Sequence, residues 1–373
     1  MAVGWASWVG RRGDSDMSLI RVAVGLLVAL FASSGAWAAG MDEPGATLFI
    51  YHRFDEPRYP STNVSATDFA RQMEFLAANG YRVIPLRELV DGLRAGRPFA
   101  PKTVAITVDD GFASTKEVAW PILQRHGFPF TVFVYAQAVV EGYPNFLKPD
   151  EIREMARAGV DFQDHGYGHV RHGNLPAGMT QEAYREGIRT DFVQGRASMR
   201  EILGHEPEYL SLPYGEYNET VLSVARGLGY RAVFTQEPGA VSQATDLYRI
   251  PREPILGTDW ATLSHFQEVL RRVDLPIRGM EPPLAPVGEG PVARFCADLS
   301  FPDRYRLSTL GIYVSGMGWK KGVLQDGRVC VEHGQPLARR SIRVAVSATE
   351  KASGRPAIGY WLLIRKGMVA PKE

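Results

Sequence analysis

The segment Ala105–Ser114, AITVDDGFAS, contains an apolar run that ends in two adjacent carboxylates, Asp109 and Asp110, with Gly111 directly after them. A short run rich in apolar and β-branched residues, bounded by a turn residue, predicts a buried strand at 103–108. Two carboxylates at a poorly solvated strand end repel each other and lose hydration. The pair is therefore either a solvated turn or the partner of a cation.

Similar strand patterns alternate with helix patterns up to about residue 272. We expect further strands at 47–52, 81–86, 130–135, 160–165, 209–215, 230–235 and 247–256, and helices after Ser65, from Ser114 to Gln124, from Pro149 and from Gln181 to Leu203. This alternation predicts parallel pairing in a β/α barrel or an open sheet, folds whose active sites lie at the carboxyl ends of strands. Asp109, Asp110, His165 and the turn Pro213–Tyr214–Gly215 all follow such strands, so we expect them to share a site.

The sequence changes character after about residue 275. A stretch rich in proline and glycine, 273–290, reads as a linker, and 291–370 contains short β-rich runs separated by turn residues. We therefore expect a small antiparallel β domain at the C-terminal end. Its two cysteines, Cys296 and Cys330, either pair in an oxidising compartment or stay as buried thiols, because spacing alone does not show that their Cβ atoms meet.

The N-terminal region predicts export. Arg21 is followed by the apolar run 22–31 and by Ala36-Trp37-Ala38, the small-x-small pattern of a signal peptide, which we assign to residues 1–38. The apolar run is shorter than the about 20 residues of a membrane span, although an uncleaved anchor is the alternative. The mature protein is expected in the periplasm, outside the cell or at the envelope, with no membrane span.

The charge balance and the histidines indicate which ligands to expect. The 373 residues carry 42 basic and 41 acidic side chains with no basic block, so nothing indicates a nucleic-acid partner. His165 and His169 are four residues apart, close enough in a tight turn to bind one metal ion. Two imidazoles and one aspartate would leave a position open for water, as catalytic Zn²⁺ sites do, whereas surface or capping histidines are the alternative.

These segments resemble a known family. TVDDGF (107–112), HGYGH (165–169) and LPYGEYN (212–218) are similar to the first three motifs of the polysaccharide deacetylases, the NodB-homology fold of carbohydrate esterase family 4. The nearest resemblance is to the exported poly-β-1,6-N-acetylglucosamine N-deacetylases. It covers roughly residues 47–272 and implies a distorted (β/α) barrel catalytic domain over 45–272, followed by the β domain that the resemblance does not cover.

The resemblance also implies roles. Asp110, His165 and His169 would hold a divalent metal ion, with Zn²⁺ favoured and Co²⁺ or Ni²⁺ as alternatives, and Asp109 would be the general base. The backbone N–H of Tyr214 would stabilise the oxyanion. The metal would neutralise one carboxylate of the pair, which accounts for their proximity.

Four further residues are candidates. His52 ends the first strand and is expected in the site, with a structural hydrogen bond as the alternative. Pro213 would shape the substrate-binding turn. Arg252 would support the base or bind substrate, or form a plain salt bridge, and Trp260 would stack on a sugar ring or pack in the core.

Some positions depart from the family pattern or leave a role open. Gly166 stands where most members have Ser or Thr, and Ser211 stands where many have an arginine that tunes the base. His172 is an alternative ligand to His169, and His265 is a candidate general acid by its LSH motif. The acid therefore stays unassigned at this stage.

The sequence as a whole predicts a metal-dependent N-deacetylase of an exported polysaccharide based on N-acetylglucosamine. The alternatives are deacetylation of peptidoglycan, chitin or xylan, and a degenerate barrel that serves as a glycan-binding or assembly protein. Partners in exopolysaccharide assembly are also compatible with the expected location.

Overall fold

The computed structural model describes residues 45–366. The expected signal peptide, residues 1–38, lies outside this range. None of the helices within the described range has both the length and the apolar character that a membrane crossing needs.

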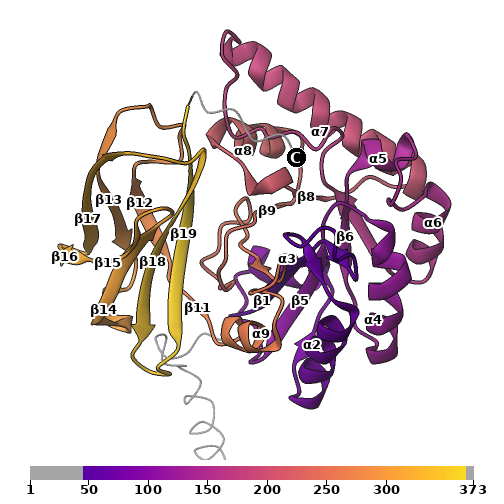
Figure 1. Cartoon of the computed structure of the whole chain (residues 1–373), viewed down its shortest axis with the longest axis horizontal. Helices are drawn as coiled ribbons and strands as arrows, with labels where there is room; N and C mark the ends of the chain where they lie inside the picture. Colours follow the sequence, from indigo (N-terminus) through magenta and orange to yellow (C-terminus); the bar gives the residue numbers. More distant parts are fainter. Residues whose placement is uncertain (1–44, 367–373) are drawn as a thin grey trace, which may run out of the picture. The chain divides into compact units, whose positions relative to one another are not determined.

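The first part of the chain folds around a curled parallel sheet (Figure 1). Its strands follow the order β10 (Glu253–Pro254), β1 (Thr47–Tyr51), β5 (Thr103–Val108), β6 (Thr131–Val134), β7 (Asp161–Asp164), β8 (Tyr209–Ser211) and β9 (Ala232–Phe234), and β4 (Arg82–Val83) pairs with β5. Every residue of β1 and β5 is buried, as expected for parallel strands covered on both faces. The predicted distorted barrel of alternating strands and helices is confirmed.

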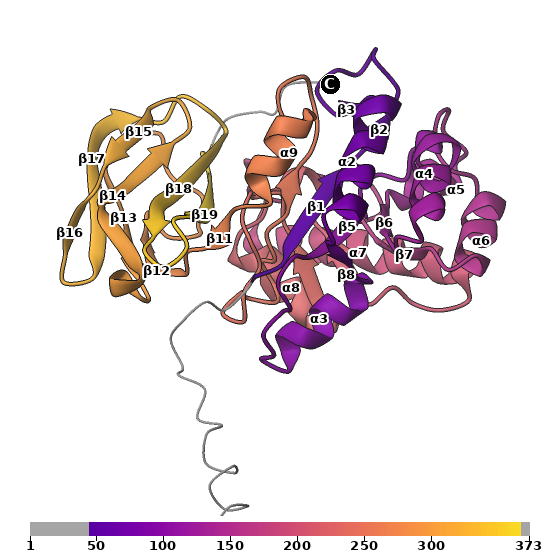
Figure 2. The same cartoon turned by 90° about the horizontal axis from the view of Figure 1, so that it is seen from below.

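Helices connect the strands and cover the outside of the sheet (Figures 1 and 2). They are α2 (Ala66–Ala78), α3 (Leu86–Arg94), α4 (Trp120–His126), α5 (Ala136–Val140), α6 (Pro149–Arg157), α7 (Gln181–Leu203), α8 (Glu219–Gly227) and α9 (Leu263–Val269). Ser65 caps α2 by accepting a hydrogen bond from the Asp68 N–H, and Pro149 is the first residue of α6, as the sequence predicts.

Ser114 stands at the start of the helix expected from Ser114 to Gln124, but its side chain makes no capping hydrogen bond. The Ser114 hydroxyl donates to Glu56 and accepts from the Phe54 N–H, so it is not available to the helix. A short π-helix (Thr115–Ala119) precedes α4, and Pro121 lies in the first turn of α4, where its missing N–H costs no hydrogen bond.

The C-terminal part is a sandwich of two mainly antiparallel sheets. One has the order β11 (Val273–Asp274), β19 (Pro356–Ile364), β18 (Ser341–Glu350), β14 (Tyr305–Val314), β15 (Gly318–Lys321); the other has β12 (Ile277–Glu281), β13 (Pro291–Leu299), β17 (Arg328–Pro336), β16 (Val323–Gln325). Cys296 and Cys330 are register partners on β13 and β17 and form a disulfide bond. The antiparallel β domain is thus confirmed.

The stretch 273–290 differs from the expected linker. It contains β11, which pairs with β19, and β12, which pairs with β13. Proline and glycine do not prevent these pairings, because both strands lie at the edge of a sheet, where free backbone groups face outward. The chain therefore enters the sandwich about 18 residues earlier than the composition suggests.

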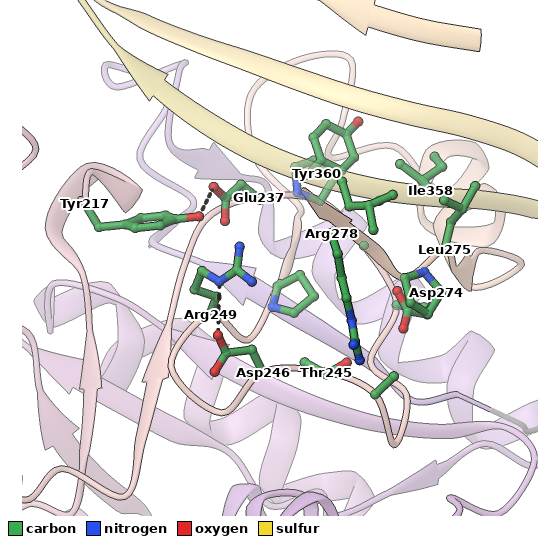
Figure 3. Close-up of a pocket in the computed structure, with 18 residues that line it drawn as sticks. Tyr217, Glu237, Thr245, Asp246, Arg249, Asp274, Leu275, Arg278, Ile358 and Tyr360 are labelled. Atoms are coloured by element: carbon green, nitrogen blue, oxygen red, sulfur yellow. Dashed lines mark hydrogen bonds and ion pairs between the residues drawn. The ribbon is translucent and has the colours of Figure 1, made fainter. Parts of the chain in front are cut away.

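The β domain packs directly on the barrel. One cluster of buried apolar side chains includes Phe192 and Val221 from the barrel helices as well as Val344 and Trp361 from the sandwich. A small cavity of about 250 Å³ remains between the two parts, lined by Glu237, Arg249 and Asp274 among others (Figure 3). The Tyr217 hydroxyl donates to Glu237 on one side of this cavity.

Candidate active site

A larger cavity of about 890 Å³ opens at the carboxyl ends of the parallel strands. Its lining includes His52 after β1, Asp110 after β5, His169 after β7 and Tyr214 after β8. Because the carboxyl ends of parallel strands meet at one edge of the sheet, residues up to 162 positions apart in the sequence line the same cavity. Aromatic side chains surround these polar groups: Tyr59, Phe112, Tyr135, Phe146 and Trp260.

Asp110, His165 and His169 converge on one point. The Nε2 atoms of His165 and His169 lie 3.2 and 3.3 Å from Asp110 Oδ1, and one ligand atom from each residue falls within 4.8 Å of the others. Asp110 Oδ1 and His165 Nε2 are buried, yet neither has a partner of hydrogen-bond geometry among the described residues. Buried polar atoms without partners are costly, and a divalent cation would satisfy both.

The other ring nitrogen of His165 is fixed. Its Nδ1 lies 2.9 Å from the Ser211 carbonyl oxygen, to which it donates, so Nε2 carries the lone pair that a metal needs. The backbone around the site is also unusual: φ is +73° at Asp110, +51° at His169 and +58° at Tyr214. A left-handed backbone conformation costs free energy for residues other than glycine. Such residues concentrate at active sites and ligand-binding sites, where the surrounding structure holds them in place.

Asp109 has a different environment from Asp110. It is buried, and Arg252 binds it with two hydrogen bonds, from Nη1 to Oδ1 at 2.7 Å and from Nη2 to Oδ2 at 2.8 Å. The Ser211 hydroxyl also donates to Asp109 Oδ2. Arg252 thus supplies from the segment before β10 the guanidinium that the family pattern places at the position of Ser211.

The charges of these groups follow from burial and partners. Burial raises the pKa of both aspartates, but Arg252 outweighs it at Asp109 and His165 with His169 outweigh it at Asp110, so both pKa values are lowered. Burial lowers the pKa of His165, yet the neighbouring carboxylates raise it above its ordinary value. Both aspartates are therefore ionised at neutral pH.

His52 follows β1 and lines the same cavity. It is buried, its Nδ1 has no hydrogen-bond partner among the described residues, and burial lowers its pKa. The structural hydrogen bond considered as the alternative role is therefore not formed at Nδ1.

The turn at Pro213–Gly215 positions Tyr214. It is a short 3₁₀ turn with Pro213 buried, and the Arg171 guanidinium lies 3.3 Å from the centre of the Tyr214 ring. Gly215 is required here, because φ is +65° and a Cβ would overlap Gln236.

The remaining candidate residues differ in their exposure and in their partners. Trp260 is 43% exposed and lines the cavity, so it is not a core residue. Arg252 has no exposed surface, which is incompatible with contact to substrate and leaves support of Asp109 as its role. His172 binds Asp191 through Nε2 at 3.1 Å and is therefore not a ligand, and His265 stacks on Trp260 in α9.

Two residues of the site region carry no sequence motif. Arg343, on β18 of the sandwich, lines the same cavity although it is 233 residues after Asp110. Asp191, on α7, accepts from the Gly168 N–H at 2.7 Å and so supports the loop between His165 and His169. The sequence did offer one signal for Asp191: it is a charged residue that lies beside Ile188 and Phe192 on the buried face of α7.

Comparisons with known proteins agree with this geometry. The family model described as polysaccharide deacetylase matches residues 96–233. Two relatives are named poly-beta-1,6-N-acetyl-D-glucosamine N-deacetylase: one from Escherichia coli K12 is 27% identical over 233 residues, and one from Staphylococcus aureus MRSA252 is 26% identical over 232 residues. The matches cover 53% and 61% of this chain, and 34% and 77% of those proteins.

Solved structures show the same fold. The Streptococcus pyogenes deacetylase PplD has a TM-score of 0.54 at 22% identity, covering 61% of this chain and 98% of that one. IcaB from Ammonifex degensii has a TM-score of 0.51 at 26% identity, covering 61% and 96%.

Proposed function

The chain carries a polysaccharide deacetylase domain, and from this premise we propose that it hydrolyses N-acetyl groups of an exported polysaccharide built on N-acetylglucosamine. The observation that supports the proposal most is the convergence of Asp110, His165 and His169 beside an ionised Asp109 in an open cavity. The names of the Escherichia coli and Staphylococcus aureus relatives support the choice of glycan.

The donor set of one carboxylate and two imidazoles fits a divalent metal ion of the zinc type, and Asp110, His165 and His169 would hold it. When bound, such an ion would supply a Lewis acid that polarises the acetyl carbonyl and lowers the pKa of a nearby water. Co²⁺ and Ni²⁺ accept the same donors.

Asp109 is the general base in this proposal. Its Oδ2 lies 3.9 Å from His165 Nε2, so the carboxylate reaches the point where the three ligand atoms converge. Arg252 and Ser211 fix its orientation, and the Arg252 guanidinium keeps it ionised by lowering its pKa. A carboxylate held this way takes a proton from the attacking water without losing its position.

Tyr214 and His52 act on the other atoms of the reaction. The Tyr214 backbone N–H, directed by the turn at Pro213, would stabilise the negative charge that develops on the acetyl oxygen. His52 reaches the cavity from β1 and, in its protonated form, would donate a proton to the amine leaving group; its lowered pKa makes that form the stronger acid. Trp260, on the rim, would stack on a sugar ring.

Export of the mature chain belongs to the same proposal, because the substrate lies outside the cytoplasm. The test is acetate release from a panel of acetylated glycans: poly-β-1,6-N-acetylglucosamine, peptidoglycan, chitin and xylan. We expect release from the first glycan, and its loss on metal chelation with recovery on adding Zn²⁺. Release from another glycan alone would reassign the substrate, and glycan binding with no release from any would indicate a binding protein.

A further inference from the structure

The catalytic cavity continues onto the β domain. Arg343 lines the cavity, is exposed and projects from β18, the third strand of the five-stranded sheet. Within residues 45–366, no acidic side chain forms an ion pair with the Arg343 guanidinium. Arg343 thus places one edge of this face of the sheet at the cavity wall.

The strand register places two exposed aromatic residues on this same face. Ala345 pairs with Tyr313, and Tyr313 pairs with Trp319. Paired residues share a face of the sheet, as do residues two apart in one strand, such as Arg343 and Ala345. The neighbours Ile312 and Val314 are buried on the opposite face, whereas Tyr313 is 40% and Trp319 is 51% exposed.

These three residues form a row across the sheet. With strands about 4.8 Å apart and about 3.4 Å per residue along a strand, the backbone of Trp319 lies about 12 Å from that of Arg343. We call Arg343, Tyr313 and Trp319 the sheet row. It leads from the catalytic cavity to the edge strand β15.

The Trp319 ring is held flat on the sheet. A Cβ at Gly311 would overlap the indole, so the ring lies directly against the backbone of β14. Its Nε1 donates to the Ser347 hydroxyl at 3.0 Å. One face of the indole therefore packs on β14 and the other stays open to solvent, in an orientation that the hydrogen bond fixes.

Polar groups flank this open ring. Lys321, two residues after Trp319, lies on the same face, and the Ser347 hydroxyl lies at the indole nitrogen; Arg343 adds a second positive charge at the other end of the row. A flat aromatic surface with hydrogen-bond donors beside it matches a sugar ring, which has one face of C–H groups and hydroxyls around its edge. An apolar protein partner would leave these charges without compensation.

We propose that the sheet row binds further sugar residues of the same polysaccharide whose acetyl group enters the catalytic cavity. The proposal rests on the proposed function, because continuity with the cavity identifies the occupant. Pre-positioning a long chain on a rigid ring would favour polymer over short substrates by lowering KM for the polymer.

The test compares polymeric poly-β-1,6-N-acetylglucosamine with a small chromogenic acetyl ester. The measured quantity is kcat/KM for the polymer divided by kcat/KM for the ester. We expect Trp319→Ala to lower this ratio about fivefold to tenfold, because KM for the polymer rises. Trp319→Phe should recover part of the ratio. Phe301→Ala, which removes an aromatic that is 56% exposed elsewhere in the same domain, should leave the ratio unchanged. Equal thermal unfolding midpoints would show that the variants are folded.

If the wild type is active on the polymer and Trp319→Ala leaves the ratio unchanged, the sheet row does not bind the polymer. The proposed function would then still stand. Wild-type protein that releases acetate from neither substrate would instead contradict the proposed function. Electrophoresis in a gel that contains the polymer then still tests the row: we expect Trp319→Ala to be retarded less than the wild type, and equal retardation would overturn it.

Discussion

At the scale of single residues, the two adjacent aspartates have different partners. Asp110 converges with His165 and His169, whereas Asp109 is bound by Arg252. We expect Asp110→Ala to lose both bound metal and activity, and Asp109→Asn to keep the metal while kcat falls about 10²- to 10⁴-fold. Elemental analysis of the purified variants beside their acetate-release rates checks this. Near-normal turnover in Asp109→Asn would remove Asp109 as the base.

Arg252 is the positioning residue for Asp109. Both are fully buried, so removing the guanidinium leaves a carboxylate without compensation in a site of low polarity. We expect Arg252→Met to lower the free energy of unfolding by about 3–5 kcal/mol. Denaturant titration measures it, and the double variant Asp109→Asn/Arg252→Met is the control. The double variant should be destabilised less than the sum of the two single changes, and simple additivity would show that the pair is not coupled.

The sequence was sufficient to find the residues that stand at strand ends. Asp109, Asp110, His165 and Tyr214 were predictable because parallel strands bring their carboxyl ends to one edge. Support of Asp109 was one of three roles considered for Arg252. The choice among them needed the structure, since it depends on where a buried guanidinium meets a residue 143 positions away. Arg343 carried no signal, because it reaches the cavity only through the packing of a second domain.

At the scale of elements, the disulfide ties β13 to β17 within the sandwich. Because the two cysteines are 34 residues apart, the bond restricts a loop of that size in the unfolded chain. We expect Cys296→Ala/Cys330→Ala to lower the free energy of unfolding of the β domain by about 3–4 kcal/mol. Unfolding of the oxidised protein and of the double variant gives the difference. Wild type in reducing agent should behave like the double variant, and no change on reduction would contradict the prediction.

Strand and helix patterns predicted most elements of the barrel, because each is long or strongly periodic. The strands β11 and β12 were missed, since they lie in a stretch rich in proline and glycine that is typical of linkers. Composition describes local preference, whereas these two strands form because neighbouring edges offer hydrogen bonds. The disulfide likewise could not be predicted from the sequence, because it depends on the register that pairs Cys296 on β13 with Cys330 on β17.

At the scale of the whole molecule, the contact between barrel and sandwich should make stability depend on pH. Burial raises the pKa of Asp274, which lines the cavity between the two parts, to about 6 (Figure 3). A raised pKa means that the folded protein binds the proton more tightly. This contribution is complete below pH of about 4 and is lost as the pH rises through 6, on the order of 3 kcal/mol.

Asp274→Asn should therefore flatten the dependence of the unfolding free energy on pH between 4 and 6. Denaturant titrations at several pH values measure it. Asp55→Asn, at an exposed position, is the matched control and should follow the wild type. Parallel curves for Asp274→Asn and wild type would show that this carboxyl does not titrate as expected.

The sandwich also holds the loop that carries Tyr214. Glu216, buried two residues after Tyr214, accepts hydrogen bonds from Arg340 at 2.9 Å and from the Ser341 hydroxyl at 2.9 Å, both in the sandwich. Arg171 of the barrel also donates to it. The β domain therefore braces a turn of the active site, in addition to continuing the cavity wall.

Replacing Arg340 should accordingly affect both stability and catalysis. We expect Arg340→Met to lower the free energy of unfolding by about 2–3 kcal/mol, because the Glu216 carboxylate loses one of its charged donors while it stays buried. We also expect kcat to fall about tenfold, since a small displacement of the turn moves the Tyr214 N–H away from the developing charge. Arg339→Met, at the exposed neighbouring position, is the control. If Arg340→Met lost stability but kept the wild-type kcat, the contact would brace the fold without positioning the turn, and the β domain would act on catalysis only through substrate binding.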